Sequence, residues 1–234
     1  MLSSKIKFVV VLLLLQVCGF AADTLSFSVL GDSYSTYEGY VSPDTNECWY
    51  KPEARFEFAA KNDVREPEQT WWYLLSRNKG WKLEVNNSYS GATIGYLGYD
   101  NKDYSDRSFI TRAPYLGKPN LIFVFGATND SWIKGPVGKF KYKDWKREDL
   151  FTFRPAMSLL ADTLKKLYPE AIICFVINTK LNPKIVSSMH TICDHYGLTC
   201  LDLKPFDKQA GHPSVKGMEE IARQISEWYD SLQK

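Results

Sequence analysis

Five short runs of apolar residues, separated by longer segments of helical spacing, most constrain the fold of this chain. The runs span residues 25–30, 83–85, 121–125, 171–177 and 199–203. The segments 68–77, 155–167, 183–196 and 213–232 carry apolar residues three and four apart, which is typical of amphipathic helices. Continuous apolar strands that alternate with helices indicate a parallel sheet covered on both faces. The sequence therefore predicts an α/β fold, a three-layer α/β/α sandwich around a five-stranded parallel sheet.

The first residues have the composition of a secretory signal. Lys5 and Lys7 precede the apolar stretch 8–15, and small residues follow at positions 21 and 22. The stretch breaks at Gln16 and is shorter than the roughly 20 apolar residues that span a bilayer. We therefore expect residues 1–22 to be a signal peptide, with no membrane span, and the protein to be secreted or periplasmic. A lipid anchor on Cys18 is the second interpretation, which the large Val17 before it disfavours.

The charge balance after removal of the signal argues against nucleic-acid binding. Loss of Lys5 and Lys7 leaves 27 basic and 27 acidic residues, whereas nucleic-acid binding needs a basic face. No repeat or linker divides the rest, and about 210 residues fit one domain. We expect residues 23–234 to form a single domain.

Four cysteines remain after the signal, and their spacing matches no zinc pattern. Cys174 lies in an apolar run and is most simply a small buried hydrophobe. Export would permit a disulfide between Cys193 and Cys200, the nearest pair in the sequence; free thiols are the alternative. Cys48 has no near partner.

The first apolar run leads directly into Gly31-Asp32-Ser33. A buried strand that enters a tight turn places the next side chain at the carboxyl edge of the sheet, where open α/β sheets bind ligands. All three residue types also favour ordinary turns. Ser33 is nevertheless positioned as a nucleophile would be, and a serine nucleophile needs a neighbouring base.

Of the three histidines, His212 is the best candidate for that base. It lies between the last apolar run and the last helical segment, and Pro213 after it suits the first turn of a helix. His190 and His195 lie inside the helical segment 183–196, where surface or helix-end positions are expected.

Two further strand ends offer donors for an oxyanion. Glycine permits close approach of the backbone, so the Gly91 amide is one candidate, and the carboxamide of Asn129 is the other. Each segment alone could be a simple turn. Their occurrence at successive strand ends favours an acyl-transfer site.

Together the four segments resemble the SGNH hydrolases, also called the GDSL esterase and lipase family. Ser33, Gly91, Asn129 and His212 match the four blocks for which that family is named, in the same order. The resemblance implies a flavodoxin-like sheet and a serine esterase that uses no metal or cofactor. It also implies that Ser33 attacks the ester, that His212 carries the proton, and that the Ser33 and Gly91 amides and the Asn129 side chain bind the oxyanion.

The chain departs from the family pattern at three places. Tyr34 replaces the usual Leu after the serine, and Ala127 stands two residues before Asn129 where Gly is usual. The orienting acid normally lies three residues before the histidine, and that position is Gln209. Three hypotheses follow: Asp207 orients His212, Gln209 or a main-chain carbonyl does so, or the enzyme works as a dyad.

Two long loops, 36–66 and 131–150, begin at strand ends and should lie over the same edge as Ser33. They are rich in aromatic residues, whose flat faces suit sugars. We expect Tyr34, Trp49 and Trp132 to contact a glycan or small-molecule ester, and short acyl groups such as acetyl to be removed from carbohydrate. The alternatives are a lipase, lysophospholipase or thioesterase for longer chains, and a non-catalytic glycan-binding domain.

Overall fold

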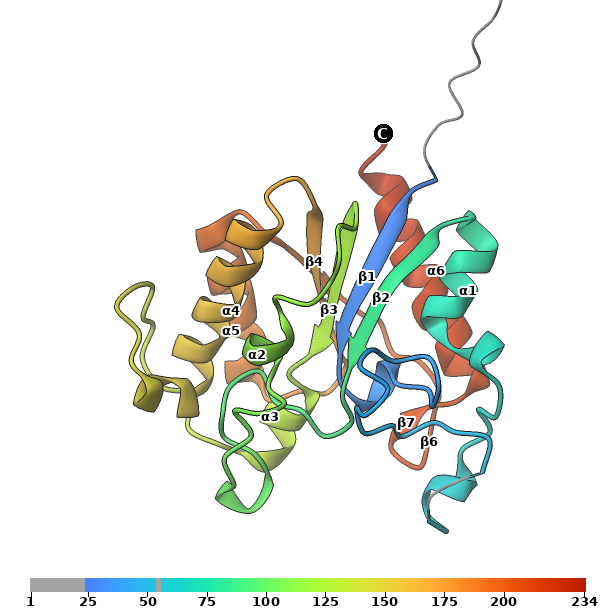
Figure 1. Cartoon of the computed structure of the whole chain (residues 1–234), viewed down its shortest axis with the longest axis horizontal. Coiled ribbons are helices and arrows are strands. Elements are labelled where there is room, and N and C mark those ends of the chain that lie inside the picture. The colour runs from blue at the N-terminus through green and yellow to red at the C-terminus, as the bar shows by residue number, and fades with distance from the viewer. Residues whose placement is uncertain (1–23, 54–55) are drawn as a thin grey trace, which may run out of the picture.

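A computed structural model describes residues 24–53 and 56–234 and contains the predicted sheet. Its strands are β1 (Ser26–Gly31), β2 (Lys82–Ser88), β3 (Leu121–Gly126), β4 (Ile172–Ile177) and β5 (Thr199–Asp202). All pairings are parallel, in the order β2-β1-β3-β4-β5 (Figure 1). This is the flavodoxin-like order, so the predicted fold class is confirmed. The expected signal peptide, with Cys18, lies outside the described residues.

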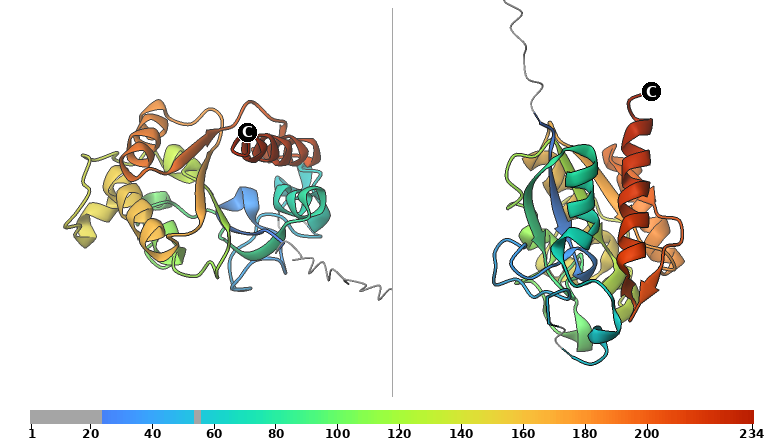
Figure 2. Two further views of the ribbon diagram at one scale, coloured as in Figure 1. Left: turned by 90° about the horizontal axis from the view of Figure 1, so that it is seen from above. Right: turned by 90° about the vertical axis from the view of Figure 1, so that its right-hand side faces the viewer.

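Helices cover both faces of the sheet, as Figure 2 shows. On one side lie α1 (Trp71–Lys79) and α6 (Val215–Ser231), and on the other lie α2 (Phe109–Arg112), α4 (Phe153–Leu167) and α5 (Pro183–Tyr196). Two smaller elements lie near the carboxyl edge: the helix α3 (Thr128–Ile133) and the hairpin of β6 (Lys208–Gln209) and β7 (His212–Pro213). Each face has its own apolar core. No helix in the described ranges is both long and apolar enough to cross a bilayer.

The helices form where apolar spacing and end-capping residues agree. In α4, Met157, Leu160 and Leu164 recur on one face and are fully buried. In α5, the side chain of Asn182 accepts a hydrogen bond from the Lys184 amide, and the helix ends at Gly197 with φ of +65°. An asparagine cap at the start and a left-handed glycine at the end are the usual signals for these boundaries.

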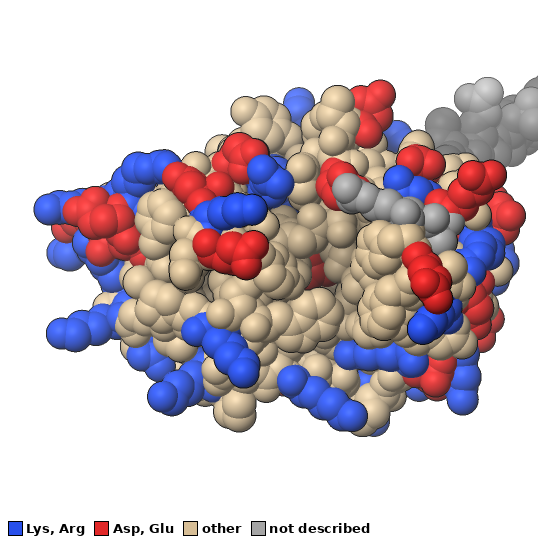
Figure 3. All heavy atoms as spheres, turned by 90° about the horizontal axis from the view of Figure 1, so that it is seen from below, with Lys and Arg blue, Asp and Glu red and all other residues tan. Residues whose placement is uncertain are grey.

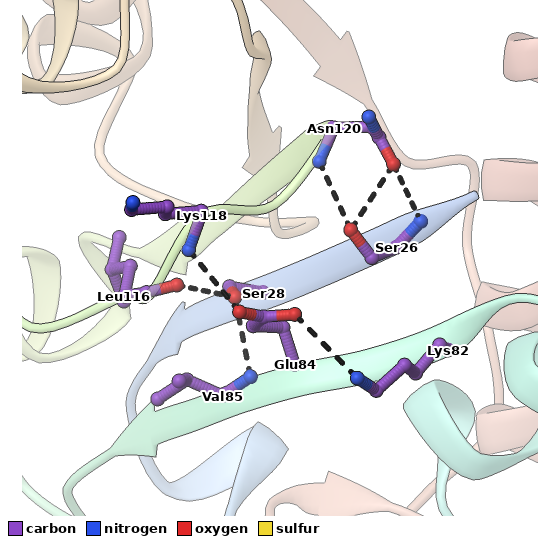
Figure 4. Close-up of polar contacts among 8 residues, drawn as sticks. All are labelled: Ser26, Ser28, Lys82, Glu84, Val85, Leu116, Lys118 and Asn120. Carbon is purple, nitrogen blue, oxygen red and sulfur yellow. Dashed lines mark hydrogen bonds and ion pairs between the residues drawn. The ribbon is translucent and has the colours of Figure 1, made fainter. Parts of the chain in front are cut away.

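The amino end of the sheet is fixed by polar contacts around β1. The register of β1 and β2 shifts between Phe27 and Ser28. The Ser28 hydroxyl donates to the Leu116 carbonyl at 2.7 Å and accepts from the Val85 amide at 3.2 Å (Figure 4). This hydroxyl therefore satisfies the Val85 amide at the irregularity in the ladder and the Leu116 carbonyl of the segment before β3.

One expectation about the chain needs correction, and one long segment was not predicted. The last helix begins at Val215, capped by Ser214, so Pro213 lies in β7 and not in the first helical turn. Residues 89–108 form a third long segment at the carboxyl end of β2, which the helical and strand patterns did not reveal.

All four described cysteines are free thiols. Cys174 is fully buried in the core, as predicted. The neighbouring Cys200 thiol and burial raise the pKa of Cys193.

Replacing Gly31 with alanine should destabilise the protein by about 1–3 kcal/mol. A Cβ at this position would lie 2.4 Å from Ser88 Oγ and 2.6 Å from Ser35 Cβ. Chemical denaturation of Gly31→Ala measures the loss. The exposed Lys184→Ala is the control and should change stability by less than about 0.5 kcal/mol; equal stability of both variants would contradict the steric argument.

Candidate active site

The ends of β1, β2 and β3 meet at one edge of the sheet. The Asp32 amide donates to the Phe125 carbonyl at 3.2 Å, and the Tyr89 amide donates to the Gly31 carbonyl at 3.1 Å. Figure 3 looks onto this edge and shows mostly uncharged side chains around a hollow, with charged side chains gathered toward the margin. The chain segments that carry the candidate residues therefore converge at this edge.

Ser33 lies in a short 3-10 turn that directly follows β1. The Asp32 side chain caps the turn by accepting from the Tyr34 amide at 3.0 Å, and Thr36 Oγ1 donates to the Ser33 carbonyl at 3.1 Å. The indole N–H groups of Trp71 and Trp72 bind Ser35 from α1. The turn is thus held by both the sheet and the first helix.

The candidate base reaches the candidate nucleophile. His212 Nε2 lies 2.9 Å from Ser33 Oγ, and His212 Nδ1 lies 3.1 Å from the Ala210 carbonyl oxygen. A carbonyl only accepts, so Nδ1 carries the proton and Nε2 presents its lone pair to the serine hydroxyl. This is the tautomer that can take a proton from Ser33.

A tight hairpin turn aims the Ala210 carbonyl at the imidazole. Gln209 pairs with His212, and the two residues between them have positive φ, +49° at Ala210 and +74° at Gly211. Two positive φ values are the signature of a type I′ turn, which favours Asn-Gly or Gly-Gly. The Asn62 side chain donates to the carbonyls of Gln209 and Pro213, both at 3.0 Å, and so fastens the hairpin to the 36–66 loop.

The structure does not bring Asp207 or Gln209 to the histidine. The Asp207 carboxylate accepts from the Ser214 hydroxyl, the cap of α6. Gln209 Nε2 donates to Asp63 at 3.2 Å. Of the three hypotheses for orienting His212, the geometry corresponds to the main-chain carbonyl, and Asp207 supports a helix start instead.

Asn129 and Gly91 lie together on the other side of the turn. Asn129 Nδ2 donates to the carbonyl of Ala92, the residue after Gly91, at 2.8 Å, and Asn129 Oδ1 accepts from the Tyr99 hydroxyl at 2.8 Å. These two bonds fix which way the amide points, and none of the described residues accepts the second hydrogen of Nδ2. Gly91 has φ of +82° and open space where a Cβ would be. Asn129 is thus tied to the segment that carries Gly91, and its second Nδ2 hydrogen is a donor of the kind that an oxyanion site requires.

The backbone two residues before Asn129 is left-handed, which explains why glycine is the usual residue at this position of the pattern. Ala127 has φ of +68° at the start of α3, so this chain uses alanine where the backbone favours glycine. Asp130 then accepts from the Ile94 amide through both carboxylate oxygens, at 3.2 and 3.0 Å. Asp32 and Asp130 therefore both fix loops.

Burial controls the proton affinities at this edge. It lowers the pKa of His212 to about 4, opposed by the hydrogen bond to Ala210 and assisted by the positive charge of Lys208. Burial raises the pKa of Asp32 to about 7, with the Tyr34 amide and the charge of Arg112 acting in the opposite direction. His212 is therefore neutral in the resting site near pH 7.

The three aromatic residues expected to contact substrate lie in different surroundings. Tyr34 is fully buried and donates to the Gly211 carbonyl at 2.8 Å, so it is a structural residue with no surface for a ligand. Trp49 is half-buried and stacks on His212. Trp132 is 46% exposed, with its ring 6.3 Å from that of His212. Only Trp132 among these three offers a large open surface.

The other two histidines lie away from the site, as expected. His190 pairs with Asp202 at 3.0 Å, and His195 stacks on Tyr142 with ring centroids 3.9 Å apart. Within residues 24–53 and 56–234, no three His, Cys, Asp or Glu residues gather as metal ligands do.

Sequence reasoning missed several residues that build the site. Asn62 and Tyr50 hold the carbonyl of Pro213, and Tyr99 orients Asn129. Ala210 gave no signal in the sequence, because two-residue hairpin turns of this type favour Asn-Gly or Gly-Gly and not Ala-Gly.

Comparisons with known proteins agree with this geometry. A family model described as GDSL-like lipase/acylhydrolase matches residues 25–229. The structure of a protein described as a GDSL-like lipase from Bacteroides ovatus is 48% identical, with a TM-score of 0.85 over 89% of this chain and 99% of that one. A similarly described protein from Bacteroides uniformis is 48% identical, with a TM-score of 0.85 over 89% and 96%.

A more distant structure shares the fold. A carbohydrate acetylesterase from Sinorhizobium meliloti is 14% identical, with a TM-score of 0.56 over 89% of this chain and 100% of that one. Among curated protein sequences, none matches this chain.

The depressed pKa of His212 predicts a wide pH range for any reaction that it serves as base. The rate constant kcat/KM should be constant from about pH 5 upward and fall below about pH 4, because the imidazole is then protonated. In Lys208→Met the fall should begin at higher pH, because the positive charge that lowers the histidine pKa is gone. If the wild-type kcat/KM fell near pH 6.5 instead, burial would not be lowering the pKa of His212.

Replacing Ala210 with asparagine should stabilise the protein by about 0.5–1 kcal/mol, because asparagine tolerates positive φ better than alanine. The carbonyl keeps its place, so activity should persist. Thermal unfolding measures the gain, and Ala210→Val is the matched variant: its branched side chain disfavours positive φ and should destabilise. If Ala210→Asn and Ala210→Val had equal melting temperatures, strain at this turn would be excluded.

Proposed function

The chain belongs to the GDSL-like lipase/acylhydrolase family and is an ester hydrolase, and on that basis we propose that Ser33 and His212 are its catalytic pair. The observation that carries the proposal is the 2.9 Å hydrogen bond between Ser33 Oγ and His212 Nε2. It joins residues that are far apart in the sequence, at the sheet edge where ligands bind in open α/β folds. It gives the nucleophile a base of the correct tautomer.

The proposed reaction proceeds in two halves. Ser33 Oγ attacks the ester carbonyl while its proton moves to His212 Nε2, and the negative oxygen is bound by the amides of Ser33 and Gly91 and by Asn129 Nδ2. As the tetrahedral species collapses, His212 gives the proton to the leaving alcohol and an acyl-Ser33 forms. Water, deprotonated by His212, then releases the acid and restores Ser33.

In this proposal the Ala210 carbonyl takes the place of an orienting carboxylate. It fixes the tautomer of His212, and it partly opposes the effect of burial on the histidine pKa. A neutral acceptor stabilises the imidazolium less than an anion does. The catalytic machinery is therefore a serine–histidine dyad supported by the main chain.

We propose acetyl or similar short acyl groups on carbohydrate as the substrate. Trp132, beside His212, exposes a flat ring, and Phe56 and Phe58 are 44% and 53% exposed beside Trp49. Exposed aromatic faces near a polar site suit the apolar faces of sugar rings. The acetylesterase from Sinorhizobium meliloti, which shares the fold, acts on carbohydrate by its name. Export by residues 1–22 would bring the enzyme to extracellular or periplasmic glycans.

The first test of the function is hydrolysis of p-nitrophenyl esters from acetate to palmitate. Wild type should be fastest on acetate, and Ser33→Ala should lose at least about a thousandfold in kcat, as loss of a catalytic nucleophile does. Asp207→Asn is the control and should retain a near-native rate, because Asp207 lies at a helix cap. Equal rates for wild type and Ser33→Ala would contradict the catalytic assignment.

The carbohydrate proposal is tested with Trp132→Ala. This variant should raise KM for an acetylated xylo-oligosaccharide by about tenfold and leave the kinetics on vinyl acetate nearly unchanged, because only the oligosaccharide carries a ring that can stack on the indole. A proportional loss on both substrates would assign Trp132 to the shape of the site and not to glycan binding.

A further inference from the structure

Trp49 lies face to face with the candidate catalytic histidine. The ring centroids of Trp49 and His212 are 3.6 Å apart, and the planes differ by 7°. Tyr34, Tyr50 and Trp132 also surround the imidazole, at centroid distances of 5.1, 6.2 and 6.3 Å, with interplanar angles of 59°, 85° and 72°. Of the described rings near His212, Trp49 is thus the one whose π face covers it.

The charge on His212 has little other support when it forms. No carboxylate of the described residues hydrogen-bonds the imidazole, since Nδ1 meets the Ala210 carbonyl. Lys208 is a positive neighbour and opposes protonation. Tyr34 and Tyr50 stay neutral because burial raises the pKa of both phenols, and each donates its hydroxyl to a backbone carbonyl. Asp32 caps the Ser33 turn by accepting from the Tyr34 amide, and burial raises its pKa to about 7, so its carboxyl is only partly ionised near neutral pH.

We propose that the indole face of Trp49 stabilises the His212 imidazolium that forms as Ser33 attacks, a stabilisation that a carboxylate supplies in related chemistry. The inference rests on the proposed esterase function. An aromatic face carries a negative quadrupole, and a cation over a tryptophan face is attracted most strongly where water is excluded. Trp49 acts through His212 and is therefore a positioning residue.

Hydrogen bonds through Thr36 fix the position of Trp49 relative to Ser33. The Trp49 amide donates to Thr36 Oγ1 at 2.9 Å, and the same hydroxyl donates to the Ser33 carbonyl at 3.1 Å. Phe56 and Phe58 contact the indole edge-on, at centroid distances of 5.4 and 6.5 Å. One threonine hydroxyl therefore links the serine turn to the residue that covers its base.

Site-specific replacement of Trp49 by a tetrafluorinated tryptophan tests the inference. Fluorination keeps the shape and cover of the ring but removes most of the negative charge on its face. We expect kcat on p-nitrophenyl acetate to fall about tenfold with KM changed less than about twofold, since the interaction is made in the transition state. The same replacement at Trp81, packed against Phe27 and Tyr229, should leave the kinetics unchanged.

The pKa of His212 distinguishes charge stabilisation by Trp49 from simple packing, because packing alone would leave that pKa unchanged on fluorination. In the adduct of Ser33 with a boronic acid, which mimics the tetrahedral species, the pKa of His212 measured by ¹⁵N NMR should be lower by about one pH unit in the fluorinated protein than in wild type. Trp49→Phe should retain more activity than Trp49→Leu, because phenylalanine keeps a π face and leucine keeps only apolar cover. A native rate and an unchanged pKa after fluorination would overturn the inference.

Failure of the esterase proposal can be recognised separately. Wild type and Ser33→Ala would then be equally inactive on every ester. Titration of His212 in the free protein would still decide the matter: a lower pKa with fluorinated Trp49 than with tryptophan supports the inference, and equal values overturn it.

Discussion

The parallel pairing of β1 with both β2 and β3 is the constraint on which the site depends. Because β1 lies between these strands, the turns that follow all three meet at the same edge. That edge receives Ser33 from the first turn, Gly91 from the second and Asn129 from the third. The register holds because Gly31 has no side chain: a Cβ there would collide with Ser88 on the neighbouring strand.

Much of the fold could be predicted because burial on both sheet faces leaves a strong pattern. Strands such as β3 and β4 are continuous apolar runs, and α4 repeats its apolar residues on one face. The segment 89–108 shows the apolar spacing of neither a strand nor a helix. Its role in holding Asn129 through Tyr99 was therefore not visible in the sequence. Local signals reveal elements, whereas the contacts that aim a side chain come from residues distant in the sequence.

The candidate site shows the same division between local and distant information. Strand ends indicated Ser33, Gly91, Asn129 and His212, but not what orients the histidine. Gln209 and Asp207 are near His212 in sequence, yet the hairpin directs both away and turns the Ala210 carbonyl toward the ring. Tyr34 follows the serine and was expected to contact the substrate. It points into the core instead, with Phe125 and Phe206 packed against its ring.

The carboxyl end of the chain lies at the opposite end of the sheet from the site, and the described residues before β1 begin at that same far end (Figure 1). Both ends of the described chain are thus on the side of the molecule that faces away from Ser33. A protein held to a bead, a fibre or a cell surface through either end would present the hollowed edge outward. An ester group on an insoluble polymer could then approach it without detaching the enzyme from its support.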